Sequence, residues 1–252
     1  MNPYEELRIK RYNNNLSDIT DKVATERRLR IFSDGKEILN LLCTPTMVKE
    51  LIVGFALSEG LLTTGQWCPE SIEIYWKDEE IEAHLPLSVP VSTPTMTSGC
   101  AKGITFSRKD NSISPINTRL RVKTDTLFGL FHNFQARSNL YKLTGGVHSA
   151  ALSDENTILC FAEDIGRHNA VDKVIGYCFL EGISTQDRIL LVSGRLSSEI
   201  ISKGARAGIP IIVSRTAPTD MAIAIAEKAN ITIVGFLRGQ RLNVYSIPER
   251  IL

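Results

Sequence analysis

Residues 188–214 read RILLVSGRLSSEIISKGARAGIPIIVS, and this stretch decides the class of fold. Its two ends, 188–193 and 210–214, are short runs rich in isoleucine, leucine and valine, as in strands that are buried on both faces. The residues between them, 197–208, have the pattern of a helix that ends at a glycine. A strand, a helix and a second strand in this order predict two parallel strands joined by a crossover helix.

The same alternation continues on both sides of this unit. The further expected elements are helices at 124–141, 168–182 and 219–230, and strands at 147–152, 157–163, 231–237 and 242–247. Buried strands separated by helices imply a mostly parallel sheet covered on both faces. We therefore expect residues 123–252 to form an α/β domain.

The N-terminal half has a different character, with short strands around one helix. The expected strands are 6–12, 27–33, 36–43, 71–76 and 79–86, and the expected helix is 48–60. Asp34-Gly35 predicts a hairpin turn between two of these strands. Residues 1–122 are thus expected to form a smaller, strand-rich α+β domain, which ends in a long loop around Cys100.

Composition excludes several classes of protein. The chain has 252 residues, of which 43% are hydrophobic and 23% charged, as in ordinary globular proteins. Its formal net charge of +1 argues against a general nucleic-acid or membrane-surface binder. No apolar run is long enough to cross a bilayer, and the polar N-terminus does not look like a secretory signal. The five cysteines contain no Cys-x-x-Cys pair, so we expect a reducing, cytoplasmic setting and no membrane partner.

Arginines follow the predicted strands of the C-terminal half at the points where ligands bind in α/β sheets. They are Arg167, Arg195, Arg215, Arg238 and Arg241. Arginine forks bind phosphate bidentately, and helix N-termini add backbone N–H donors. This pattern predicts a site for a phosphate-rich ligand such as a nucleotide or dinucleotide. The alternative is that these residues are helix caps and solvated charges.

Two histidines lie near the same predicted edge. His148 follows Gly145-Gly146, and His168 begins a helix. Either could belong to the site, serve as a hydrogen-bonded structural residue, or bind a metal. The zinc deaminase signature, His-x-Glu followed by Pro-Cys-x-x-Cys, is absent, so we expect no zinc.

Cys100 stands in the stretch TMTSGCAKGITF, residues 95–106, between Gly99 and Gly103 and two residues before Lys102. Nearby cations and free backbone N–H groups lower the pKa of a thiol, and a thiolate on a loop can attack and carry a group. The alternative is an incidental loop cysteine. The other cysteines are interpreted as structural, namely Cys43, Cys160, Cys178 and, less clearly, Cys68.

Several long motifs resemble the formate dehydrogenase accessory protein family, FdhD/NarQ. They are TGGVHSAAL, EDIGRHNAVDKVIG, VSGRLSSEI, GIPIIVSRTAPT and GFLRGQRLNVYS, in this order between residues 144 and 246. The resemblance implies a sulfurtransferase that takes persulfide sulfur from a cysteine desulfurase. It passes this sulfur to the molybdenum cofactor, bis-molybdopterin guanine dinucleotide, which formate dehydrogenase needs. It also implies a cytidine deaminase-like fold, without zinc, for the C-terminal domain.

The resemblance also assigns residues. Cys100 matches the persulfide cysteine. The segment that matches the family's cofactor-binding motif consists of Phe236, Leu237, Arg238, Gly239, Gln240 and Arg241. With His148, Arg167, Arg195 and Arg215, these residues make up the predicted cofactor site.

One departure from the family keeps an alternative open. Many members carry Cys-Gly-x-Cys-Gly in the loop, whereas this chain has Cys100-Ala101-Lys102-Gly103-Ile104 and lacks the second cysteine. The alternative function is a cofactor-binding chaperone without sulfur transfer. A zinc-dependent deaminase is disfavoured by the missing ligands. The oligomeric state stays open, with a homodimer among the alternatives.

Overall fold

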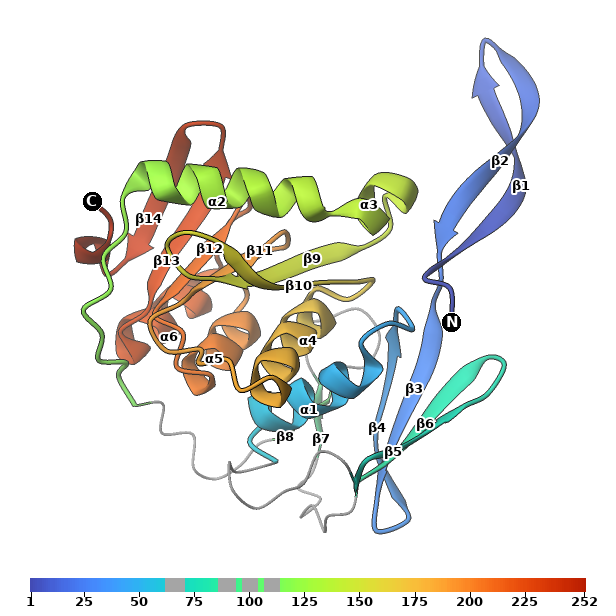
Figure 1. The fold of residues 1–252 in the computed structure, drawn as a ribbon, viewed down its shortest axis with the longest axis horizontal. Coiled ribbons are helices and arrows are strands. Elements are labelled where there is room, and N and C mark those ends of the chain that lie inside the picture. The colour runs from blue at the N-terminus through green and yellow to red at the C-terminus, as the bar shows by residue number, and fades with distance from the viewer. Residues whose placement is uncertain (62–70, 86–93, 97–103, 107–113) are drawn as a thin grey trace.

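The computed structural model describes residues 1–61, 71–85 and 114–252, together with two short backbone strands, β7 (Pro94–Met96) and β8 (Ile104–Phe106) (Figure 1). The two short strands pair antiparallel with each other. The sequence pattern did not predict them, because the residues around them lack a clear period.

A six-stranded sheet organises the C-terminal half. Its strands, in spatial order, are β10 (Ile158–Asp164), β9 (His148–Ser153), β11 (Ile189–Val192), β12 (Ile211–Ser214), β13 (Thr232–Arg238) and β14 (Arg241–Ser246). Strands β11, β12 and β13 are parallel, as the strand–helix–strand pattern predicts. The other neighbouring pairs are antiparallel. The expectation of a mostly parallel sheet is therefore wrong. Short hairpins join β9 to β10 and β13 to β14, and β9 lies between β10 and β11 and runs antiparallel to both.

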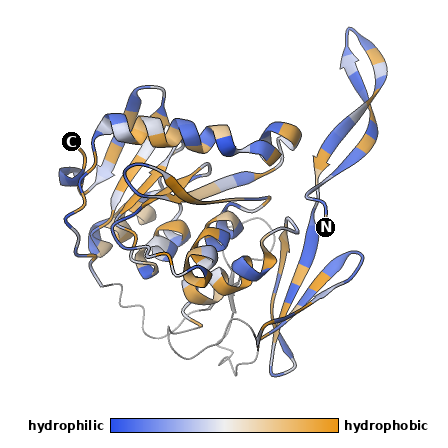
Figure 2. Ribbon diagram, in the orientation of Figure 1, coloured by the Kyte–Doolittle hydropathy of each residue, from blue (hydrophilic) through white to orange (hydrophobic). Residues whose placement is uncertain are grey.

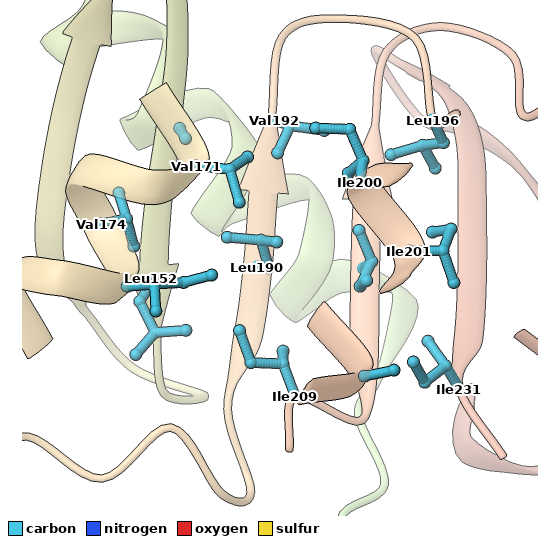
Figure 3. Close-up of a cluster of buried hydrophobic side chains, with 14 of the residues drawn as sticks. Leu152, Val171, Val174, Leu190, Val192, Leu196, Ile200, Ile201, Ile209 and Ile231 are labelled. Atoms are coloured by element: carbon cyan, nitrogen blue, oxygen red, sulfur yellow. The ribbon is translucent and has the colours of Figure 1, made fainter. Parts of the chain in front are cut away.

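Helices cover both faces of this sheet, as expected. Helix α2 (Thr124–Arg137) lies along one face, and helices α4 (Arg167–Leu180), α5 (Ser198–Arg206) and α6 (Asp220–Ala229) lie on the other (Figure 1). Figure 3 shows Val171 and Val174 of α4 and Ile200 and Ile201 of α5 gathered over the strands that carry Leu152 and Leu190. In Figure 2 the hydrophobic colour gathers on the strands between these helices. Apolar side chains of these helices and strands thus form the core between the helices and the sheet.

The helix expected over 124–141 is two helices. Helix α2 ends at Arg137, and a short helix α3 (Asn139–Thr144) follows. Ser138 separates them with a non-helical ψ of 68°. Its buried hydroxyl lies 2.9 Å from that of Ser149 on strand β9, so a contact with the sheet fixes the break.

A four-stranded sheet occupies the N-terminal half, in the order β4 (Lys36–Cys43), β3 (Arg27–Ser33), β6 (Glu80–Leu85) and β5 (Glu73–Trp76). The two expected hairpins are present, and the Asp34-Gly35 turn has positive φ angles of 47° and 71°. Helix α1 (Val48–Ser58) covers one face with a cluster of apolar side chains.

A long hairpin precedes this sheet. Strand β1 (Tyr4–Asn13) pairs with β2 (Asn15–Ala24) along its whole length, and Asn14 makes the turn with a φ of 62°. The sequence predicted β1 but missed β2, whose residues NLSDITDKVA are largely polar.

Helices α1 and α4 join the two halves at a close crossing. A Cβ atom added at Gly54 would lie 1.8 Å from the carbonyl oxygen of Asp172, and one added at Gly176 would lie 1.9 Å from that of Glu50. Only glycine fits at either position, so these two residues let the helix backbones touch. Beside the crossing, the buried Lys203 ammonium lies 2.9 Å from Asp172 and 3.2 Å from Glu59.

Candidate functional site

The sheet topology brings the predicted site segments to one edge. Strand β9 is antiparallel to both β10 and β11, and β11, β12 and β13 are parallel to one another. Strands β10, β11, β12 and β13 therefore all end at the same edge of the sheet. Strands β9 and β14 begin there, because His148 pairs with Asp164 and Arg238 pairs with Arg241. Helices α4, α5 and α6 also begin at this edge. Their N-termini add backbone donors and positive dipole ends to the arginines.

His148, Arg167 and Gly194 meet at this edge. A Cβ atom at Gly194 would lie 3.2 Å from both Cβ and Cδ of Arg167 and 3.4 Å from Nδ1 of His148. The glycine therefore allows the loop after β11 to close on the other two residues. The Nδ1 atom of His148 lies 3.3 Å from the hydroxyl of Ser193, which accepts a hydrogen bond from the backbone N–H of Ser149.

The electrostatics of His148 favour the neutral ring. Burial, reinforced by the Arg167 guanidinium, lowers the pKa of His148. A neutral imidazole keeps one nitrogen as an acceptor and one as a donor. His148 can therefore bind a ligand as a hydrogen-bonding group rather than as a cation.

Asp164 holds the turn that carries Arg167. Its side chain is fully buried, and its Oδ2 atom lies 2.6 Å from Nζ of Lys173 and accepts a 3.0 Å hydrogen bond from the backbone N–H of Thr44. Its Oδ1 atom accepts 2.8 Å hydrogen bonds from the Gly166 backbone and from Nδ2 of Asn169. Helix α4 begins one residue after Gly166. The carboxylate thus fixes where Arg167 leaves the sheet.

Sequence reasoning assigned no role to Asp164 or Lys173. The signal that could have found them is an acid at the end of a buried strand, followed by an asparagine and a lysine on one helical face at Asn169 and Lys173. The partner in the N-terminal half, Thr44, stands 120 residues away in the chain. No local pattern indicates such a contact.

His168 is a buried neighbour of this cluster. Burial and the charges of Lys203, Arg167 and His148 lower the pKa of His168 to about 3. Its Nε2 atom lies 3.2 Å from a carboxylate oxygen of Glu199, which opposes the shift, but burial together with the nearby cations outweighs this single contact. Among the alternatives for His168, the geometry favours a neutral, structural residue.

Hydrogen bonds join the loop after β11 to the loop after β12. The hydroxyl of Ser214 donates a 2.7 Å hydrogen bond to the carbonyl of Gly194 and accepts a 3.0 Å hydrogen bond from the backbone N–H of Thr216. The Leu196 backbone N–H donates to the carbonyl of Ala217, and the Thr219 backbone N–H donates to the carbonyl of Leu196. These contacts hold in place two exposed arginines, Arg195 and Arg215.

The end of β13 has an unusual backbone. Phe236 has a positive φ of 50°, which for a bulky residue costs about 1–3 kcal/mol. Its backbone N–H donates to the carbonyl of Thr216 at 3.2 Å, and its half-buried ring lies 5.7 Å from the guanidinium carbon of Arg238. Arg238 also donates from Nε to the carbonyl of Arg215 at 3.2 Å. The ends of β12 and β13 therefore form a second group around exposed arginines.

The remaining residues of the predicted cofactor-binding segment, 237–241, differ in how far they are exposed to solvent. Gly239 makes the turn with a φ of 59°, and Gln240 and Arg241 are exposed. Leu237 is only 3% exposed and packs in the core beneath α2. Its side chain therefore stabilises the sheet, and only its backbone is available to a ligand.

Other sequence predictions concern the cysteines and metals. Cys100, Lys102 and Cys68 lie outside the described residues. Cys43, Cys160 and Cys178 are buried free thiols, which agrees with a structural role, and burial raises the pKa of Cys43 to about 12.

In the part of the chain that the structure describes, no three His, Cys, Asp or Glu side chains are grouped as a metal site would require. No helix there is long and apolar enough to cross a membrane.

Comparisons with known proteins agree on one family. The model of the FdhD/NarQ family matches residues 24–252. The protein named sulfur carrier protein FdhD from Listeria monocytogenes serotype 4b is 40% identical over 247 residues, covering 93% of both chains. Its namesake from Bacillus subtilis is 35% identical over 246 residues, covering 94% of this chain and 92% of that one.

A solved structure has the same fold. It is described as a putative formate dehydrogenase accessory protein from Desulfotalea psychrophila, and it matches with a TM-score of 0.80 and 26% identity over the full length of both chains. The order of motifs, the sheet edge and these matches lead to one assignment: the chain belongs to the FdhD/NarQ family of sulfur carrier proteins.

Proposed function

We propose that this chain is a sulfurtransferase that carries sulfur as a persulfide on Cys100. In the first step the Cys100 thiolate attacks the terminal sulfur of a persulfide on a cysteine desulfurase. A new S–S bond forms at Cys100, the S–S bond in the desulfurase breaks, and the desulfurase cysteine leaves as a thiolate. The outer sulfur then passes to bis-molybdopterin guanine dinucleotide, the substrate, before formate dehydrogenase receives that cofactor. In this second step the S–S bond at Cys100 breaks, Cys100 leaves as a thiolate, and the reduced molybdenum centre of the substrate supplies the two electrons that convert the sulfur to the sulfide level.

The observation that carries this proposal is the group of arginines and helix N-termini at one edge of the six-stranded sheet. The relatives of the chain are named sulfur carrier proteins. Arginines and three helix N-termini lie at this edge, as a ligand with several phosphates requires. Arg238 and Arg241 would bind phosphates, and Arg167, Arg195 and Arg215 would add positive charge. Neutral His148 and the backbone of residues 236–240 would supply hydrogen bonds, and the Phe236 ring offers an apolar surface.

The alternative function is a cofactor-binding chaperone without sulfur transfer. The observation that favours it is the loop sequence, in which Gly103 stands where many family members have a second cysteine. One thiolate is chemically sufficient to hold a persulfide. We therefore prefer the transferase, which needs no internal resolving thiol for the step written above.

We also propose a cytidine deaminase-like fold for residues 123–252 and a separate strand-rich domain for residues 1–122. The parallel strands β11, β12 and β13, with helices on both faces of their sheet, support the first part. The protein would work in the cytoplasm without zinc, nucleic acid or membrane. Its partners would be the desulfurase and formate dehydrogenase.

Intact-mass measurement tests the transferase. The purified protein is incubated with a cysteine desulfurase and cysteine, and we expect one added sulfur that a reductant removes. Cys100→Ala should abolish the addition, whereas Cys68→Ala, the matched control at the other cysteine outside the described residues, should keep it. The Cys100→Ala protein should also fail to activate formate dehydrogenase. Full activation by that variant would leave the chaperone as the function.

A further inference from the structure

A cavity of about 540 Å³ lies where the last turns of three helices meet. Helices α1, α4 and α5 pack against one another (Figure 1), and Ser58, Phe179 and Arg206 from their last turns all line the cavity. Helices α4 and α5 begin at the sheet edge that carries the arginines. The cavity therefore lies at the other end of these helices, about 20 Å away along the 14 residues of α4.

The cavity has the size and the apolar walls of a small-molecule site. Ligand pockets in proteins commonly measure about 300–1,000 Å³ and are lined mainly by apolar side chains. The apolar residues that line this cavity are Leu57, Ile175, Phe179, Ile183 and Ala207. Leu57, Phe179 and Ile183 are only half-buried, so part of this apolar surface is open to a molecule that enters. An apolar chain or ring therefore fits against it.

Among the residues that the structure describes, the charged side chains that line the cavity are both cations. They are Lys203 and Arg206, and the lining contains no Asp or Glu. Burial alone would lower the pKa of Lys203, but Asp172 and Glu59 outweigh it, so the pKa is raised and the ammonium stays charged. Because Lys203 donates its hydrogen bonds to these two carboxylates, the cation left for a ligand is Arg206.

The Arg206 guanidinium keeps donors that no described residue uses. Its Nη1 atom donates to the carbonyl of Ser58, which anchors the side chain against the end of α1. Within the described part of the chain, Nε and Nη2 make no hydrogen bond and the guanidinium has no ion pair, although the residue is exposed. The Nε and Nη2 side of a guanidinium is a fork that binds a carboxylate bidentately.

The loop before β11 adds hydroxyl groups to the same lining. The Thr185 hydroxyl donates to the carbonyl of Ala207, which fixes this loop to the end of α5. The Ser184 hydroxyl accepts a 3.3 Å hydrogen bond from the backbone N–H of Gln186, and its own proton remains as a donor. The cavity thus combines an apolar wall with a cation and a neutral donor.

We propose that this cavity binds a small organic acid, with its carboxylate on Arg206 and its apolar chain or ring against Leu57, Ile175 and Phe179. A carboxylate complements the guanidinium fork, and the lining places no acid where it would repel the ligand. This inference does not rest on the proposed function, because the cavity shares no residue with the sheet edge.

A titration of the full-length protein with 3-phenylpropionate, followed by the NMR shifts of backbone amides, tests the proposal. The amides of residues 183–186 and 206–207 should shift and saturate, with a dissociation constant of about 1 mM or below. The neutral probe 3-phenylpropanol, which has the same apolar body, should bind at least about tenfold more weakly, because it cannot form the charge-assisted pair with Arg206.

Variants locate the acid in the cavity. Arg206→Ala should weaken binding of the acid about tenfold or more and leave binding of the alcohol unchanged, and Arg206→Lys should restore part of the loss. The matched control is Arg137→Ala, because Arg137 is likewise the exposed last residue of a helix but lies outside the cavity. This control should bind the acid as wild type does. Ser184→Trp, which adds a large ring to the lining, should block both probes.

The contrary results are equally distinct. Absence of saturable shifts in the wild type at about 10 mM acid would exclude the site, and shifts at residues 236–241 instead would place the acid at the sheet edge. Equal affinities for acid and alcohol, or an equal loss in Arg137→Ala, would show that Arg206 does not select the charge. Wild-type binding by Ser184→Trp would place the acid outside the cavity. Unchanged amide shifts of strands β9 to β14 confirm that each variant is folded.

Discussion

At the scale of single residues, the Asp164 carboxylate connects the site to the N-terminal half of the chain. It contacts Lys173, Thr44, Gly166 and Asn169 at once, and both members of the ion pair with Lys173 are fully buried. A buried ion pair is costly to break, because removing one charge leaves the other without compensation in a medium of low polarity.

Asp164→Asn should therefore lower the free energy of unfolding by about 3–5 kcal/mol. The reason is that the Lys173 ammonium would keep only the carbonyls of Thr44 and Glu163 as partners. Urea denaturation followed by circular dichroism measures the change. Asp18→Asn, which breaks the exposed ion pair with Lys10 in the hairpin, should cost about 1 kcal/mol or less. Equal effects of the two changes would contradict a special role for Asp164.

Arg238 and Arg241 provide the residue-scale test of the ligand edge. GDP serves as a stand-in for the nucleotide end of the cofactor. A charge-assisted hydrogen bond contributes about 1.5–3 kcal/mol, so replacing either arginine by alanine should weaken GDP binding about ten- to a hundredfold in calorimetry. Lysine should restore binding only in part, because it lacks the bidentate fork. Arg8→Ala in the hairpin should leave binding unchanged, and unchanged binding in the Arg238, Arg241 double variant would place the site elsewhere.

At the scale of secondary-structure elements, the crossing of α1 and α4 depends on two glycines. Gly176→Ala would place a methyl group 1.9 Å from the Glu50 carbonyl oxygen, which is backbone and cannot rotate away. The helices would have to separate, so we expect a loss of about 1–3 kcal/mol or more in the free energy of unfolding. Gly129→Ala is the matched control, since it lies in α2 with nothing within 4 Å. That change should stabilise the protein by about 0.5–1 kcal/mol, and thermal unfolding of both variants distinguishes the two effects.

The elements that the sequence predicts well are those whose pattern is local. The strands and helices from residue 147 onward follow from apolar runs and glycine stops, and they placed the arginines at one edge of the sheet. Strand β2 was missed because its pattern is polar, and the break at Ser138 was missed because a contact with Ser149 on the sheet causes it. The Asp164 and Lys203 networks join residues more than a hundred positions apart, so no local pattern could indicate them.

At the scale of the whole molecule, the two histidines near the edge make stability depend on pH. The pKa of His168 is lowered from 6.5 to about 3, and that of His148 is lowered as well. The unfolded chain therefore binds more protons than the folded one as the pH falls below about 6.5, so stability is lost between that pH and about 3. His168→Gln should lose less stability than wild type between pH 7 and pH 5, measured by urea denaturation. An identical loss in both proteins would show that His168 is not protonated on unfolding.

The glycine crossing also bears on how the chain folds during synthesis. Helix α1 leaves the ribosome long before α4, because Gly54 precedes its contact at Gly176 by more than a hundred residues. Because the chain is made from the N-terminus onward, one side of α1 and the Thr44 backbone have no partner from the C-terminal half until α4 has been synthesised. The nascent N-terminal half is thus expected to stay exposed to chaperones and proteases for most of translation. Its lasting protection begins only when residues 164–203 have emerged.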